Sequence, residues 1–159
     1  MDEKKKTRIA EIGAEYVDTL KARMVCSEQY RPPKDHARGL ARMIEAFAGS
    51  LFRLECGLPF SEVADDWLMF LPFDLCGSGL DIDGLGLEAE RQVTYVLDIG
   101  NEVDHMRRRI LDCIRMLAVE GQGAHRTPLP VDLLSRVFIV GLMLAVLGDL
   151  EMKNGKENV

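Results

Sequence analysis

Apolar residues recur at alternating steps of three and four along one long segment of the chain. They are Val96, Ile99, Val103, Met106, Ile110, Cys113 and Leu117. This spacing places seven side chains on one narrow face of an α-helix, the kind of seam by which helices pack on one another. The pattern predicts a long helix from about Leu87 to Gly121 and favours a helical bundle.

Similar spacing predicts three further long helices. The first runs from about Glu3 to Ser27 and buries a stripe made of Ile9, Ile12, Tyr16, Leu20 and Met24. The second starts near Pro33 and ends at Gly57, since proline suits a first turn and glycine a helix end. The fourth and last long helix in chain order starts near Pro130 and runs to about Met152. Its stretch 137–148 has no polar residue but is too short to span a bilayer, which favours a central core helix.

Residues 58–86, between the second and third long helices in chain order, differ from the rest of the chain in their sequence pattern. Leu-Pro-Phe occurs at 58–60 and at 71–73, on either side of a short helix that Ser61 can cap. Apolar residues are contiguous over 67–71, so this short helix is apolar nearly all round. A glycine-rich stretch follows Pro72 and predicts a loop of about a dozen residues.

Together these elements predict an all-α fold: a bundle of four long helices plus one short apolar helix, with a glycine-rich loop before the third long helix. The length of 159 residues suits one domain over 1–152, followed by a polar tail over 153–159. No domain-scale repeat is found.

Charge is distributed unevenly along the chain. The net charge is −6, but residues 57–104 contain 11 acidic residues and a single basic one, Arg91. Phosphate binding requires clustered cations, so this block argues against duplex nucleic acid as the main partner. It suits a basic protein surface or a divalent cation, and the alternative is a solvated acidic face.

The cysteines indicate the cellular compartment of the protein and do not indicate a metal site or a redox site. Four are present, at 26, 56, 76 and 113, and no C-x-x-C pair occurs, so neither a zinc ribbon nor a redox motif is indicated. Each lies in or beside an apolar run, where a reduced cysteine behaves as a small hydrophobe. With no recognisable signal peptide at the start, this favours a cytoplasmic protein with free thiols.

One polar stripe is a candidate metal site. Asp98, Glu102, His105 and Arg109 follow one another at steps of four, three and four beside the apolar seam. Glu102 and His105 have the E-x-x-H spacing that resembles one half of a di-iron carboxylate bundle, and Asp98 is the expected third ligand in this reading. The alternative is an exposed ladder of acid, histidine and arginine stabilised by neighbouring pairs.

A second candidate lies in the glycine-rich stretch. Aligned on an EF-hand calcium loop, Asp81, Asp83, Gly84 and Glu90 occupy positions three, five, six and twelve. Position one is Gly79, where the motif requires an acidic ligand. A flexible acidic linker explains the same residues without an ion.

Two classes of function stay open. In the first, the chain is a non-enzymatic interaction module, such as a small subunit, adaptor or inhibitor. It presents Trp67, Phe70 and Phe73 to a protein partner beside the acidic residues Asp81 and Asp83, without a cofactor. In the second, it is a metal-dependent enzyme of the carboxylate-bundle type. The apolar runs at 67–71 and 137–148 also exceed what a small core needs, which predicts a homodimer.

Overall fold

The computed structural model describes residues 3–30, 36–75, 79–99, 103–123 and 131–157. These residues form six α-helices and contain no strand, so the predicted all-α bundle is confirmed. The helices are α1 (Glu3–Tyr30), α2 (His36–Glu55), α3 (Phe60–Leu75), α4 (Ile82–Ile99), α5 (Val103–Gly123) and α6 (Val131–Glu157).

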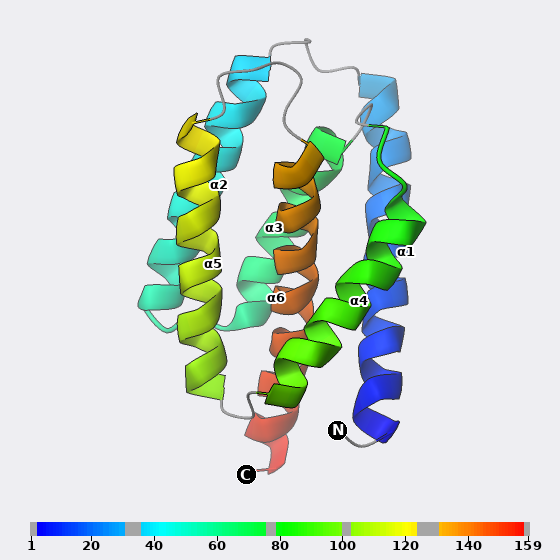
Figure 1. Cartoon of the computed structure of the whole chain (residues 1–159), viewed down its shortest axis with the longest axis vertical. Helices are drawn as coiled ribbons and strands as arrows, with labels where there is room; N and C mark the ends of the chain where they lie inside the picture. Colours follow the sequence, from blue (N-terminus) through cyan, green and yellow to red (C-terminus); the bar gives the residue numbers. More distant parts are fainter. Residues whose placement is uncertain (1–2, 31–35, 76–78, 100–102, 124–130, 158–159) are drawn as a thin grey trace.

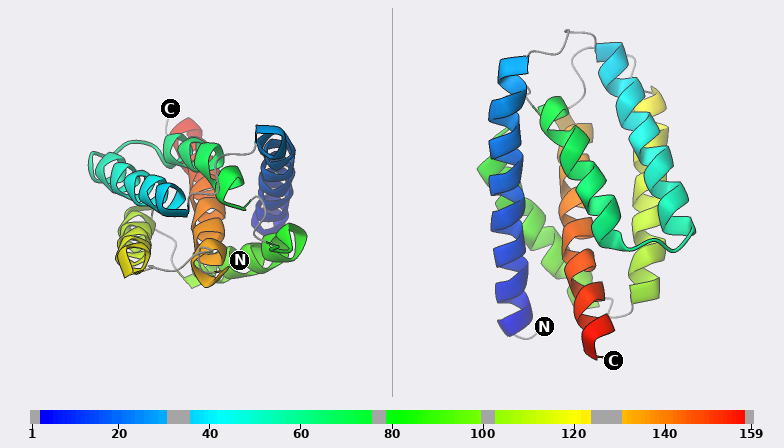
Figure 2. Two further views of the ribbon diagram at one scale, coloured as in Figure 1. Left: turned by 90° about the horizontal axis from the view of Figure 1, so that it is seen from above. Right: turned by 180° about the vertical axis from the view of Figure 1, so that it is seen from behind.

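Helix α6 is the centre of the bundle (Figures 1 and 2). It contacts α1, α3, α4 and α5, while α2 packs outside it against α3 and α5. By length and composition the stretch Leu133–Lys153 of α6 could cross a membrane, and 67% of its most apolar part is buried inside the bundle. A helix enclosed by four neighbours must be apolar on nearly all sides, which explains why the stretch 137–148 has no polar residue.

The core follows the predicted stripes closely. Ile9, Ile12, Tyr16 and Leu20 of α1 are buried, and so are Met106, Ile110 and Leu117 of α5. The largest central contribution comes from α6, whose side chains without exposure are Val137, Phe138, Leu142, Leu144 and Val146. Apolar burial on this scale is the main source of the stability of the fold.

Two glycines let neighbouring helices approach α6 closely. A Cβ at Gly141 would collide with the hydroxyl of Tyr16, and one at Gly148 would lie 2.9 Å from the backbone of Ser61. The Tyr16 hydroxyl donates a hydrogen bond of 3.0 Å to the carbonyl oxygen of Phe138. Burial raises the pKa of Tyr16, so the phenol stays protonated and keeps this bond.

The long helix predicted over 87–121 is two helices in the structure. The chain ends α4 at Ile99 and begins α5 at Val103, and the two helices run in opposite directions (Figure 1). Residues 100–102 lie outside the described part of the chain. Their sequence begins with Gly100 and Asn101, the residue types that most often follow a helix end.

Other boundaries differ from the prediction as well. Helix α4 begins at Ile82, so much of the glycine-rich stretch is helical rather than a loop, and α3 continues past Pro72 to Leu75. At the other end of the chain, α6 runs on to Glu157 through most of the predicted polar tail.

The connection between α2 and α3 is held by an ion pair from two other helices. Glu151 of α6 accepts a hydrogen bond of 2.7 Å from the backbone N–H of Phe60, so it caps α3 in place of the expected Ser61. Arg107 of α5 binds Glu151 at 2.9 Å and donates to the carbonyl oxygen of Leu58 at 3.0 Å. Its guanidinium also lies over the Phe60 ring, 4.4 Å from the centroid.

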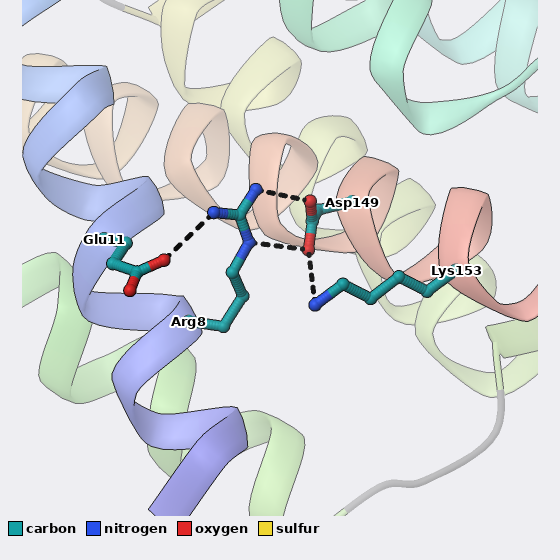
Figure 3. A network of polar contacts seen from close by, with 4 residues as sticks. All are labelled: Arg8, Glu11, Asp149 and Lys153. Carbon is teal, nitrogen blue, oxygen red and sulfur yellow. Dashed lines mark hydrogen bonds and ion pairs between the residues drawn. The ribbon is translucent and has the colours of Figure 1, made fainter.

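A second ion pair joins α1 to α6 near the same end of the molecule (Figure 3). Arg8 donates two hydrogen bonds to the carboxylate of Asp149, at 2.8 and 3.2 Å, and a third to Glu11 at 3.1 Å. Lys153 lies 3.7 Å from the same carboxylate. The Arg8 hydrogen bond lowers the pKa of Asp149, so this group is ionised at neutral pH.

Candidate functional site

The structure corrects the expected position of the aromatic cluster. Trp67 is 0% exposed, and its indole N–H donates a hydrogen bond of 2.7 Å to the hydroxyl of Ser50. Its ring packs against Phe47 and Phe70, with centroids 5.7 and 5.5 Å away, and Phe70 is buried too. Both residues are therefore part of the core and do not form an exposed anchor. The side chain of Phe73 lies outside the described residues.

The predicted acidic partners lie at the start of α4. Asp81 precedes the helix and its carbonyl oxygen accepts the backbone N–H of Leu85 at 2.9 Å. Asp83 is in the first turn and pairs with Lys21 of α1, with 2.5 Å between the Lys21 nitrogen and the Asp83 oxygen. Both side chains are exposed, and negative charge at this position stabilises a helix N-terminus.

The calcium-loop alternative is wrong. Asp83, Gly84 and Glu90 all lie within α4, whereas an EF-hand needs an open loop that folds around the ion. The Glu90 carboxylate instead lies against Gly13 of α1, at 3.7 Å from the position of an added Cβ.

The polar stripe proposed for a metal is divided between two helices. Asp98 is in α4, whereas His105 and Arg109 are in α5, because the predicted single helix is broken between them. Glu102 and the side chain of His105 lie outside the described residues. In the described parts of the chain, no three His, Cys, Asp or Glu side chains are grouped so that they could hold a metal ion.

A different surface stands out on the outer face of α4. Helix α4 buries Ile82, Ala89, Val93 and Leu97 against α1 and α6. On the opposite side, Leu87 is 72% exposed and Tyr95 is 67% exposed, with Arg91 between them at steps of four. A hollow of about 300 Å³ is lined by Arg91, Gln92, Tyr95 and Val96.

The polar side chains on this face hold one another in place. Glu88 accepts a hydrogen bond of 2.5 Å from Arg91 and one of 3.0 Å from Gln92. These bonds lower the pKa of Glu88, and the first raises the pKa of Arg91, so both groups are charged at neutral pH. The surface therefore combines exposed apolar side chains with an exposed pair of opposite charges.

The acidic block in the sequence does not form one acidic surface. Most of its described residues are divided between α3 and α4, which lie on opposite sides of α6 (Figures 1 and 2). Several are also paired: Asp66 with Arg53, Asp83 with Lys21, and Glu88 with Arg91. Helix α4 itself contains four acidic residues, at 83, 88, 90 and 98, and one basic residue, Arg91.

Leu87 and Tyr95 were not predicted as site residues, although the sequence contains a signal for them. Within α4 the buried positions 82, 86, 89, 93 and 97 repeat at steps of four and three, and Leu87 and Tyr95 fall outside that stripe. Exposed apolar residues that gather on one face of a helix can mark a binding surface, whereas singly scattered ones are ordinary. This signal is visible only when the helix is started at Ile82 rather than at Leu87.

Comparison with known proteins gives no match: no protein-family model, no curated protein and no solved structure is significantly similar to the chain.

Proposed function

We propose that the protein is a non-enzymatic interaction module that binds another protein through the outer face of α4. The observation that supports this most directly is the exposure of Leu87 and Tyr95, at 72% and 67%, on either side of the hollow-lining Arg91. Aromatic and arginine side chains are the commonest energetic anchors of protein interfaces. The hollow beside Tyr95 gives a side chain of the partner a place to pack.

The surroundings favour an amphipathic segment with basic flanks as the partner. An apolar side chain of the partner would enter the hollow beside Tyr95 and Val96, and its cations would face the acidic positions of α4. Helix α4 contains four acids and one base, and of these acids Asp83 and Glu88 already pair with Lys21 and Arg91, so a basic segment would compete with these two cations.

The rigidity of α4 also favours binding. The helix is held by its buried stripe against α1 and α6, and Glu88 forms hydrogen bonds with Arg91 and Gln92 on its exposed face. Side chains that are ordered before binding lose less conformational entropy when the partner arrives. A partner therefore meets a surface that is already arranged.

The test is a screen of a peptide library that covers the proteome of the source organism, followed by calorimetry on the enriched peptides. We expect enrichment of basic amphipathic sequences. Tyr95→Ala and Leu87→Ala should each weaken binding about tenfold or more, as expected for anchor residues.

Met69→Ala is the matched control, because Met69 is 68% exposed but lies on α3, on the other side of the bundle. It should leave the affinity unchanged. Equal loss of affinity in Met69→Ala, or enrichment that ignores charge and amphipathic pattern, would contradict the proposal. Circular dichroism of each variant confirms that the bundle stays helical.

A further inference from the structure

Among the helical glycines with described surroundings, Gly49 of α2 differs from the others. A Cβ added at Gly49 would meet no atom within 4 Å. The others each face a neighbouring atom within that distance, namely Gly13, Gly84, Gly86, Gly141 and Gly148. Glycine inside a helix is destabilising relative to alanine, so a glycine is expected there only where something approaches closely. Nothing in the described part of the chain approaches Gly49.

A bulky side chain lies one turn from this bare position. Phe52 is 68% exposed and shares the outward face of α2 with Gly49. That face follows positions 45, 49, 52 and 56, at the steps of four, three and four that helices use to pack on one another. One exposed phenylalanine is ordinary, but here it lies one turn from an exposed position that has no side chain, on the same face of the helix.

Because the large side chain of Phe52 and the missing side chain of Gly49 share one face, that face is complementary to a second copy of itself. We infer that the chain forms a two-fold symmetric homodimer in which α2 packs antiparallel against α2 of a second copy. The ring of Phe52 then lies over Gly49 of the second copy, and the contact occurs twice because the interface is isologous. The missing Cβ of Gly49 provides the room for the ring.

Charge is complementary in the same alignment. When the two-fold axis of the dimer passes between positions 50 and 51 of α2, Glu45 lies opposite Cys56 of the second copy. It then also lies within one helical turn of Arg53 of the second copy. Glu45 is exposed and Arg53 has a half-exposed side chain that pairs with Asp66 of its own chain. Each end of the interface therefore brings a carboxylate near a guanidinium.

Helix α5 enlarges the surface. It lies beside α2 and runs antiparallel to it (Figures 1 and 2), and Arg115 of α5 binds Glu55 of α2 at 2.8 Å through side chains that are about half exposed. One turn along each helix from this ion pair are Phe52 on α2 and Val119 on α5. Val119 is 69% exposed, and its neighbour Met116 is exposed as well. The dimer thus covers apolar side chains from two helices.

The apolar runs at 67–71 and 137–148, from which a homodimer was predicted, lie mostly inside the bundle, with Met69 as the exposed member of the first run. The interface is therefore assigned to α2 and α5, on the side of the molecule away from α4. Its test does not depend on the interaction partner proposed above.

Sedimentation equilibrium of the full chain from about 1 to about 100 µM tests the inference. We expect a mass of about twice 17.8 kDa at the upper end. Phe52→Glu should raise the dissociation constant at least about tenfold, and Gly49→Ala should raise it too while the monomer becomes more resistant to heat. Met69→Glu, at a position of equal exposure on α3, should leave the equilibrium unchanged. A monomer at every concentration, or equal effects of Phe52→Glu and Met69→Glu, would overturn the inference.

The alignment of the two helices has its own test. Glu45→Cys should form a disulfide with Cys56 of the second copy under mild air oxidation, identified by mass spectrometry of the linked peptides. Within one chain these positions are about 16 Å apart along the helix, which is too far for a disulfide. The wild type, whose two Cys56 thiols would be similarly far apart, should not crosslink. Linkage between the two new thiols, or no linkage, would contradict the antiparallel packing.

Discussion

Two carboxylates of α6 each tie a distant part of the chain to the central helix. Asp149 receives two hydrogen bonds from Arg8, which is 141 residues away in sequence, and Glu151 caps α3 at Phe60. Arg107 holds Glu151 in place. Polar contacts of this kind make the packing of α1 and α3 against α6 specific, while apolar burial supplies most of the stability of the fold.

Asp149→Asn should destabilise the protein at neutral pH by about 1 kcal/mol, because the bidentate and partly buried contact with Arg8 is stronger than an exposed ion pair. The pKa of Asp149 is lower in the folded chain than in the unfolded chain, so its contribution is present above pH ~4 and decreases as the pH falls through the folded pKa. Urea unfolding of both proteins from neutral to acidic pH should therefore show a difference that narrows with acid.

Asp112→Asn is the matched control, since Asp112 forms a single exposed bond of 3.1 Å with Arg115 on its own helix. It should change the free energy of unfolding by less than about 0.5 kcal/mol. A difference between wild type and Asp149→Asn that stays constant into acid would show that ionisation of Asp149 is not what stabilises the contact.

Sequence predicts burial at the residue scale better than it predicts exposure. The stripe of Ile9, Ile12, Tyr16 and Leu20 is buried as expected, because its periodicity matches the helix. Trp67 shows the limit of this reasoning. An aromatic residue within a contiguous apolar run can equally belong to a core or to an interface, and only the position of α6 decides between them. The pairing of Trp67 with Ser50 has no sequence signal at all.

At the scale of one element, α3 continues for three residues beyond Pro72 where the sequence predicts that it ends. Proline has no N–H, so the carbonyl oxygen of Leu68, four residues earlier, loses its normal partner. Arg23 of α1 replaces it by donating a hydrogen bond of 2.7 Å to that oxygen. A side chain from another helix thus allows α3 to pass through a proline.

A double-mutant cycle at these two positions tests this account. Arg23→Met should destabilise the protein by about 1 kcal/mol, since it leaves the Leu68 carbonyl without a protein donor. In a Pro72→Ala background the same change should cost less, because the new backbone N–H can bond the Leu68 carbonyl. The free energies of unfolding would give a coupling of at least about 0.5 kcal/mol. Additive effects would mean that Arg23 acts elsewhere.

The existence of most helices follows from the sequence, but their boundaries and number follow less well. Apolar residues repeat at steps of three and four both in one continuous helix and in two successive helices that each pack on the core. The spacing therefore cannot show the break, and α4 and α5 were predicted as one helix. The glycines at 84 and 86 similarly indicated a loop, although both lie within α4. There Gly86 permits close packing, because an added Cβ would collide with Val17 of α1. Tertiary contacts outweigh local propensity at such positions.

At the scale of the whole molecule, α3 and α4 lie on opposite sides of α6 (Figure 2), so the acidic stretch of the sequence is divided between two faces. The two proposed surfaces are also separate, one on α4 and one on α2 with α5. A homodimer formed through α2 therefore leaves both copies of α4 available. Such an assembly would present two equal binding surfaces, which raises the apparent affinity for a partner with two matching segments.

Dimerisation also predicts how stability depends on concentration. Because the second copy binds only the folded chain, a hundredfold increase in protein concentration should raise the melting temperature by roughly 3 °C. Phe52→Glu should melt at a temperature that does not change with concentration. Differential scanning calorimetry of both proteins at two concentrations makes the comparison, and equal shifts in the two would contradict the assigned interface.

The central position of α6 has a consequence for how the chain folds while it is being synthesised. It is the last of the described helices to leave the ribosome, and at about 5 to 20 residues per second its 27 residues take roughly 1 to 5 s to add. Throughout that interval the five earlier helices are already made, but the helix that four of them pack against is missing. The nascent chain therefore exposes its future core until α6 has been added, and chaperones that hold apolar segments should be needed most during that interval.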